Sequence, residues 1–355
     1  MRKLFTSLSC LLLVAAANAQ TTTSISLSDF ITKKGDSLYK AGKLPGIFVG
    51  ILNKGEKQFF NFGYAIPDDK LPFDSATLFE AGSITKTFTA YILTSILQQK
   101  GISDSSSIIS YLPDSMQSNK ALQGITFLSL LNHTSGLTRL PTNMILTADD
   151  MTPYDHYTMA DLFSYLKTAT PKPDGKSNYS NLGMGLAGVL AQRISGKDYP
   201  TLLRQLIFVP FSMKAPGNGN KHRKSQGYFG EKKAVYWTMN ALAPAGALQS
   251  TANEMLAYLS YMSNPATEQT KTVITQLLKP TVVVTPTMQV GRAWHTFEQK
   301  NQPIIYWHNG GTYGFSTFAA FVKGTGQAVI IVVNKFNSNA VSDGLGIAIM
   351  KKMLE

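Results

Sequence analysis

Residues 81–100 read AGSITKTFTAYILTSILQQK, and most of the fold follows from this stretch. Apolar side chains recur in it at four-residue spacing, at Ile84, Phe88, Ile92 and Ile96. That is the period of a helix with one face against a core, so the spacing predicts a largely buried helix over 83–100, which Gly101 ends. A buried helix that begins with small polar residues would place Ser83 and Lys86 against an apolar wall.

Segments with strand character lie at both ends of the chain. β-Branched and aromatic residues dominate the runs 47–52, 58–64, 282–290, 314–322 and 328–334. Turn residues predict hairpins at 53–56 and 323–326, and amphipathic patterns predict helices over 28–43, at about 342–354 and through most of 102–265. We therefore expect an α/β (α+β) fold. Both chain ends would build one antiparallel sheet flanked by helices, and the middle would form a mostly helical lobe.

The first 19 residues predict a signal peptide. Arg2 and Lys3 precede an apolar run, and Ala17-Asn18-Ala19 offers the small residues that a signal peptidase reads, with cleavage before Gln20. The protein is then expected to cross the inner membrane and to be periplasmic or extracellular, with no transmembrane anchor after cleavage.

Residues 20–355 are expected to form a single domain. Its sheet lobe would comprise about 20–95 and 270–355, and its helical lobe about 96–269. With 44% hydrophobic residues in 355, the chain has enough apolar material for a large core. We expect a monomer.

Composition and motifs argue against several classes of function. The one cysteine, Cys10, lies in the expected signal peptide, so thiol chemistry is excluded from the mature chain. The five histidines match no metal motif, and no phosphate-binding loop is present, so we expect no metal and no organic cofactor. The net charge of +12 comes mostly from scattered residues without a nucleic-acid motif, so we expect no nucleic-acid partner.

The chemistry is carried by a Ser-x-x-Lys pattern, which occurs three times, at Ser37/Lys40, Ser83/Lys86 and Ser164/Lys167. The first and third pairs fall in amphipathic helices whose lysines can point to water. Ser83 instead begins the apolar helix, where unpaired N–H groups favour negative charge. A desolvated lysine one turn later can take the proton that serine must lose. The pair alone leaves open a simple N-cap with a snorkelling lysine.

Two further segments support a catalytic interpretation. The segment Tyr179-Ser180-Asn181 precedes an apolar helix. A tyrosine near an ammonium group has its phenolate favoured and can relay protons. Asn181 can orient Lys86 or hold a substrate amide. His308-Asn309-Gly310-Gly311-Thr312 is expected at the start of a strand. There, its glycines would let a substrate approach and point N–H groups at a carbonyl oxygen.

Together, S-x-x-K, Y-x-N and the H-x-G element resemble, in this order, the three motifs of the serine β-lactamase and penicillin-binding protein superfamily. Tyrosine in the middle motif is similar to the class C β-lactamase, DD-carboxypeptidase and esterase branch, as are the stretches 130–137 and 244–252. The resemblance implies a β-lactamase/transpeptidase-like fold and an acyl-enzyme on Ser83. It further implies that Lys86 and Tyr179 manage the proton and that the N–H groups of Ser83 and Gly311 form the oxyanion hole. Asn181, His308, Asn309 and Gly310 would bind a small-molecule or peptidoglycan-derived substrate.

The third motif departs from the class C pattern, which has lysine where this chain has His308. Histidine is charged only part of the time at neutral pH, which weakens the case for efficient penicillin hydrolysis and predicts that carboxylate-bearing substrates bind better at lower pH. The functions left open are a β-lactamase, a D-peptidase or DD-carboxypeptidase, a carboxylesterase, or a penicillin-binding receptor with little turnover. A non-catalytic binding protein is disfavoured because all the motif residues are present.

Overall fold

The computed structural model describes residues 25–147, 150–213 and 223–355. The signal peptide expected over 1–19 lies outside the described residues. Within the described ranges, no helix is both long and apolar enough to cross a bilayer.

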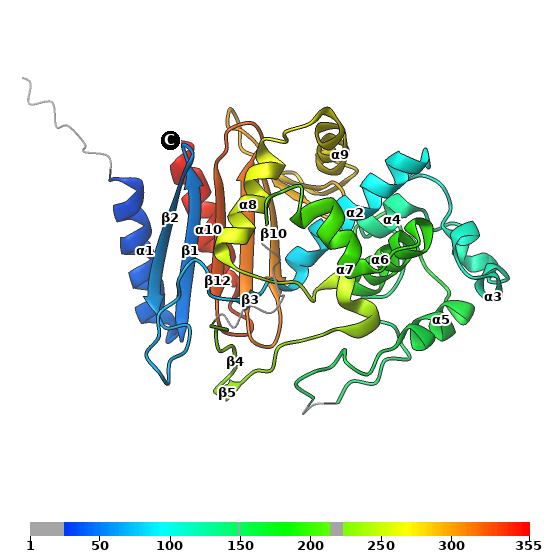
Figure 1. Ribbon diagram of the computed structural model, residues 1–355, viewed down its shortest axis with the longest axis horizontal. Helices are drawn as coiled ribbons and strands as arrows, with labels where there is room; N and C mark the ends of the chain where they lie inside the picture. Colours follow the sequence, from blue (N-terminus) through cyan, green and yellow to red (C-terminus); the bar gives the residue numbers. More distant parts are fainter. Residues whose placement is uncertain (1–24, 148–149, 214–222) are drawn as a thin grey trace, which may run out of the picture.

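One antiparallel sheet dominates the structure (Figure 1). Its eight strands follow the order β2-β1-β12-β11-β10-β9-β8-β7. Their bounds are β1 Gly46–Asn53, β2 Glu56–Gly63, β7 Val282–Thr285, β8 Met288–Val290, β9 His295–Phe297, β10 Ile305–Gly311, β11 Ser316–Val322 and β12 Ala328–Val333. Two small pairs are formed by β3 Phe79–Glu80 with β6 Gln249–Ser250 and by β4 Tyr228–Phe229 with β5 Lys232–Lys233. Because β1 pairs with β12 along most of its length, the two chain ends build one sheet, as the sequence predicted.

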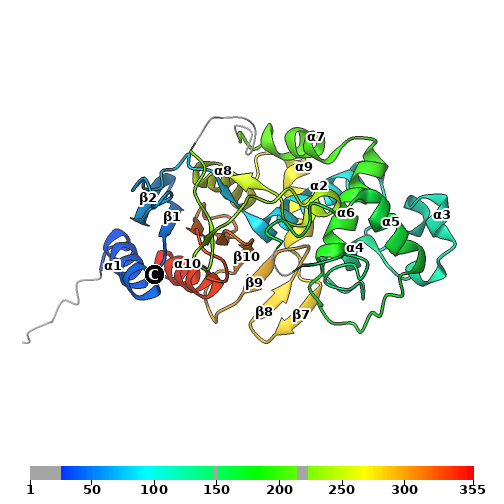
Figure 2. The same cartoon turned by 90° about the horizontal axis from the view of Figure 1, so that it is seen from below.

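Helices cover both faces of this sheet. Alternate residues of β12 point to opposite sides: Val329 and Ile331 belong to the core under α1 (Leu27–Gly42) and α10 (Asn339–Met353), and Ile330 belongs to the core under α8 (Ala252–Ser263). Figure 2 shows α1 and α10 together on one side and α8 on the other.

A group of helices lies beyond the sheet, on the right of Figure 1. Their bounds are α2 Thr85–Lys100, α3 Asp114–Gln117, α4 Phe127–Leu131, α5 Met159–Thr168, α6 Asn181–Ser195, α7 Tyr199–Leu203 and α9 Glu268–Leu278. α2 is buried on every side from Thr85 to Leu97 and packs against α6 and α9, which confirms the helix expected from the apolar repeat.

Small residues in α6 bring a neighbouring segment close. A Cβ at Gly188 would lie 2.2 Å from Pro244 Cγ, and one at Gly185 would lie 2.5 Å from Leu242 Cδ2. The 3₁₀ segment Asn240–Ala245 therefore packs directly on α6 and against α2, with its last carbonyls beside the start of α2.

Two sequence expectations about strands need correction, and two strand segments were missed. The run 282–290 is a hairpin of β7 and β8, broken at Pro286-Thr287, and not one strand. Strand β9 and the first half of β10 were not predicted, because each offers only a few residues with strand character. The segment His308–Thr312 lies at the end of β10 rather than at the start of a strand, so its glycines are where the strand stops.

Candidate active site

Ser83 lies in a tight turn between a strand and a helix. β3 pairs with β6, the 3₁₀ turn Gly82–Ile84 follows, and α2 begins at Thr85. The Thr85 hydroxyl donates to the Gly82 carbonyl at 2.6 Å and accepts the N–H of Leu248 at 3.0 Å, which ties the turn to a distant segment. The hydroxyl of residue 83 is therefore held at the N-terminal end of a buried helix.

Lys86 lies directly behind Ser83. Its side chain is fully buried, and Nζ lies 2.9 Å from Ser83 Oγ and donates to the Ala245 carbonyl at 2.6 Å. Burial lowers the pKa of Lys86 well below its usual value, and the nearby charge of Arg139 lowers it further. A neutral amine has a lone pair, so this nitrogen can accept the Ser83 proton.

The other two Ser-x-x-Lys pairs lack this geometry. Lys40 is exposed and pairs with Asp36, and both Ser164 and Lys167 are exposed on α5. Ser83 and Lys86 thus form the one pair of the three in which the lysine is buried against its serine.

Tyr179 completes the cluster around Lys86. Lys86 Nζ lies 4.7 Å from the centroid of the Tyr179 ring, and the guanidinium carbon of Arg139 lies 5.1 Å from it. Burial raises the pKa of Tyr179 above its usual value, although a hydrogen bond with the Ser83 side chain and the charge of Arg139 both lower it. The expectation of a favoured phenolate is therefore wrong: in this buried site the resting side chain is the phenol, which can donate a proton.

The loop that carries Tyr179 is held by His133. The Ser180 N–H donates to His133 Nδ1 at 3.2 Å, and the His133 ring packs 4.7 Å from the Tyr179 ring, centroid to centroid. Burial is the main reason that the pKa of His133 falls to about 3, so the ring is neutral at physiological pH. His133 positions the tyrosine and does not face the cleft.

Asn181 is the first residue of α6, after the N-cap Ser180. Its Nδ2 donates to the Tyr154 hydroxyl at 3.3 Å, while its Oδ1 is buried and has no hydrogen-bond partner among the described residues. No hydrogen bond joins Asn181 to Lys86 among the described contacts, and of the two roles expected for Asn181 the binding of a substrate amide stays a prediction.

The end of β10 lies against the nucleophile turn because both are built from glycine. A Cβ at Gly310 would lie 2.0 Å from the Ala81 carbonyl oxygen, and one at Gly82 would lie 2.7 Å from the Gly311 nitrogen. Gly82 also has φ +54°, a conformation that favours glycine. These contacts bring the backbone of residue 311 beside the Ser83 turn, as an oxyanion hole requires.

His308 does not behave as a charged substrate ligand. Its side chain is fully buried, and its pKa lies well below the usual value, first because of burial and then because of the neighbouring His295 and Lys86. The interpretation of His308 as a partly charged group at neutral pH is therefore wrong.

Hydrogen bonds fix the side chains of His308 and Asn309 in β10. His308 Nδ1 faces the Asn309 carbonyl, which can only accept, so Nδ1 carries the proton. Asn309 lines the cleft, but its Nδ2 donates to Asp343 of α10 at 2.6 Å, which anchors the side chain to that helix.

These segments surround a cleft of about 440 Å³, within the usual size of small-molecule sites. Its lining comprises Ser83, Arg139, Tyr154, Tyr179, Asn181, Trp237, Asn309, Gly310, Gly311, Thr312, Tyr313, Phe336, Asn337 and Asn339. Sequence reasoning missed the aromatic wall of Tyr154, Trp237 and Tyr313, and it missed Arg139. Arg139 lies two residues after the stretch 130–137, which is the signal that could have found it.

Glu80 was also missed, although it stands three residues before Ser83. Its buried carboxylate accepts the Trp237 N–H at 2.5 Å and the Thr312 hydroxyl at 2.7 Å. It therefore joins the nucleophile strand to two segments that line the cleft. Burial raises the pKa of Glu80 to about 7, against the opposing effect of those hydrogen bonds and of Lys224.

Comparison with known proteins gives a consistent result. A family model described as Beta-lactamase matches residues 28–351. The chain is 25% identical to a beta-lactamase of Escherichia coli (strain K12) over 94% of this chain and 95% of that protein. It is 23% identical to the D-alanyl-D-alanine-carboxypeptidase/endopeptidase AmpH of the same organism, over 87% and 84%. A solved class C beta lactamase from Rhodobacter sphaeroides shares the fold, with a TM-score of 0.77 and 20% identity over 92% of this chain and 99% of that one.

Proposed function

Because the chain belongs to the β-lactamase family, we propose that it is an exported serine hydrolase that cleaves amide or ester bonds through an acyl-enzyme on Ser83. The observation that carries this proposal is the contact of a fully buried Lys86, whose pKa burial lowers, with the Ser83 hydroxyl at 2.9 Å. A poor nucleophile gains a base at hydrogen-bond distance, which is the requirement for covalent catalysis by serine.

The first half-reaction forms an ester. Ser83 Oγ transfers its proton to Lys86 Nζ and attacks the substrate carbonyl, and the N–H groups of Ser83 and Gly311 hold the resulting oxyanion. The bond to the leaving group breaks as its nitrogen or oxygen takes the Tyr179 proton, and the Lys86 ammonium returns a proton to Tyr179. The protonated phenol favoured by burial supports this role.

The second half-reaction releases the acyl group. A water molecule gives one proton to the Lys86–Tyr179 pair and attacks the ester carbonyl, and Ser83 recovers its proton when the ester bond breaks. A free acid leaves, and the site returns to its starting protonation state.

For the substrate, we propose a β-lactam or a D-alanyl peptide, the substrates named for the two relatives in Escherichia coli. A carboxylesterase is the second candidate, because the neutral His308 replaces the permanent cation of class C enzymes. A penicillin-binding receptor would use the same acylation and differ only in slow release.

A kinetic panel tests these proposals. It combines a chromogenic cephalosporin, a D-Ala-D-Ala peptide and a p-nitrophenyl ester with the variants Ser83→Ala and Ser164→Ala. The second variant is matched, since Ser164 also precedes a lysine by three residues but is exposed. Ser83→Ala should lose activity toward every substrate and Ser164→Ala should keep it. Full activity in Ser83→Ala would overturn the proposal.

Intact-mass spectrometry with a penicillin separates the alternatives. An adduct that forms and decays indicates turnover, a persistent adduct indicates a receptor, and absence of an adduct together with ester cleavage indicates an esterase. The same instrument tests export: protein recovered from the periplasm or medium should begin at Gln20, and a mass that includes residues 1–19 would contradict cleavage.

A further inference from the structure

Arg139 has a distinctive place in the cleft. Among the described residues that line it, Arg139 alone carries a full charge. The side chain is exposed, and its guanidinium lies over the ring of Tyr179. Every other lining group is an aromatic ring, an amide, a hydroxyl or backbone.

The backbone of this residue is held firmly. Its carbonyl accepts the N–H groups of Asn181 at 2.9 Å and Leu182 at 3.3 Å. The preceding carbonyl, of Thr138, accepts the Ser180 hydroxyl at 2.7 Å. Arg139 is therefore fastened to the N-terminal end of α6, beside the motif residues.

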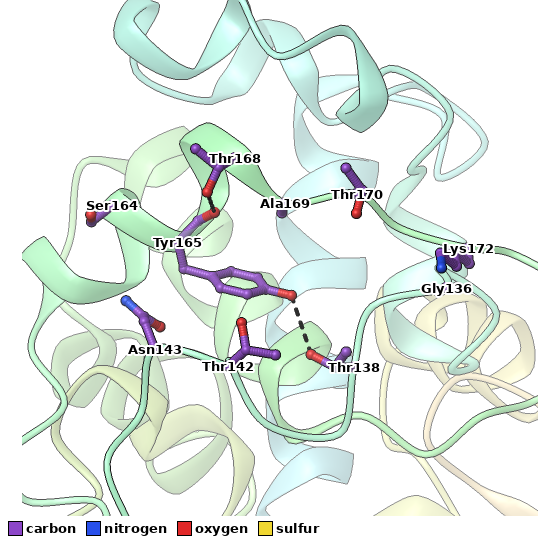
Figure 3. A pocket seen from close by; sticks show the side chains of 10 residues that line it. All are labelled: Gly136, Thr138, Thr142, Asn143, Ser164, Tyr165, Thr168, Ala169, Thr170 and Lys172. Atoms are coloured by element: carbon purple, nitrogen blue, oxygen red, sulfur yellow. Dashed lines mark hydrogen bonds between the residues drawn. The ribbon is translucent and has the colours of Figure 1, made fainter.

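The same loop borders a second cavity, which is lined by Thr138 of the loop and Tyr165 of α5 (Figure 3). There the Thr138 hydroxyl donates to the Leu140 carbonyl at 2.7 Å and lies 3.2 Å from the Tyr165 hydroxyl of α5. The loop is thus bonded on both sides while the Arg139 side chain extends into the cleft.

Ion pairing within the described residues leaves the Arg139 guanidinium uncompensated. No carboxylate in the part of the chain that the structure describes lies within ion-pair distance of it. An arginine offers five N–H donors in a planar fork that matches a carboxylate. Its contact with an aromatic ring leaves those edge donors free.

The third motif supplies no positive charge to the same cleft. His308 is neutral and buried, and it is not among the residues that line the cleft. Recognition of a substrate anion therefore requires another cation, and Arg139 is the described lining residue that carries one.

We propose that Arg139 binds a carboxylate of the substrate, on the wall formed by Tyr179 and Asn181, and thereby makes the enzyme selective for anionic substrates. This inference rests on the proposed serine-hydrolase function. The substrate is then an acylated compound with a free carboxylate.

Matched substrate pairs test the proposal. One pair is p-nitrophenyl hemisuccinate and its methyl ester, which differ by a carboxylate on the acyl part. The other is a D-Ala-D-Ala peptide and its C-terminal amide, which differ on the leaving part. The wild-type protein should favour the anionic member of at least one pair by tenfold or more in kcat/KM, mainly through KM. Arg139→Gln should lower kcat/KM for the anionic member at least tenfold more than for the neutral member, and Arg139→Lys should restore part of the preference.

Two outcomes would overturn the inference. One is a wild-type protein that treats both members of each pair alike. The other is an Arg139→Gln variant, with an unchanged melting temperature, that loses both members equally, since the arginine would then act only through Tyr179 and Lys86. Activity that survives Ser83→Ala would instead refute the proposed function, so the two failures are distinguishable.

Discussion

Replacing the buried carboxyl Glu80 by its neutral isostere should change how stability depends on pH. A carboxyl whose pKa rises from 4.5 to about 7 on folding holds its proton more tightly in the native state. The native state then binds more protons than the unfolded state between pH 4.5 and 7, so the free energy of unfolding falls as pH rises through this range. The rise of the Glu80 pKa from 4.5 to about 7 corresponds to roughly 3 kcal/mol in the free energy of unfolding, at about 1.4 kcal/mol per pH unit.

Glu80→Gln removes this contribution and leaves a group that can still accept from Trp237 or Thr312. The free energy of unfolding of the variant, minus that of the wild-type protein, should therefore increase by roughly 3 kcal/mol between pH 4.5 and pH 8. Any constant penalty from the amide geometry cancels in this change, as do the other titrating groups.

Urea unfolding at pH 4.5, 6, 7 and 8 measures this difference. Glu56→Gln is the control for loss of a negative charge, because Glu56 is exposed at the start of β2. Parallel curves for Glu80→Gln and the wild-type protein, within 1 kcal/mol across the range, would show that burial of Glu80 does not raise its pKa.

Three other substitutions test the site. Lys86→Met should slow acylation by about 10²–10⁴-fold, which is the usual contribution of a positioned base. The melting temperature should not fall, because an apolar side chain suits that buried position. Stopped-flow acylation and thermal melts measure both effects, and an unchanged acylation rate would exclude Lys86 as the base. Gly310→Ala should lower kcat/KM by about 10²-fold, because the new Cβ would lie 2.0 Å from the Ala81 oxygen and push β10 away from the nucleophile turn. The control is Gly344→Ala, whose new Cβ meets nothing within 4 Å, and it should keep full activity. His308→Asn should leave the pH dependence of KM between pH 6 and 8 unchanged, because the wild-type ring is neutral throughout; a profile that flattens in the variant would show that His308 titrates there.

The framework of the fold could be predicted because its signals are local. The four-residue repeat from Ile84 to Ile96 and the dense β-branched runs near both termini depend only on neighbours in sequence. The first half of β10 was missed because both of its faces are covered: Tyr306 packs against one core cluster and Trp307 against the other. Such a strand lacks the alternation of apolar and polar residues that marks a half-exposed one.

The motif residues could be predicted, but their protonation states could not. Lys86, Tyr179 and His308 have their pKa values set by burial, and that burial is created by segments distant in sequence, such as Asn240–Ala245. Arg139 was missed although it closely follows the stretch 130–137, because a single arginine in a polar loop is usually a solvated surface charge. Its role follows from the two backbone hydrogen bonds that hold it at the end of α6.

Burial links the proton chemistry of the site to its selectivity. The apolar wall that deprives Lys86 of hydration, and so makes it a base, also surrounds His308 and makes a permanent charge at that position costly. A neutral ring there avoids placing a second cation beside the lysine, which would otherwise lower the lysine pKa further. Recognition of a substrate anion then moves to the solvent-exposed Arg139, where a charge costs little and the cleft is open. The departure from the class C motif and the arginine on the opposite wall are thus two consequences of one requirement, that the proton-carrying groups remain neutral.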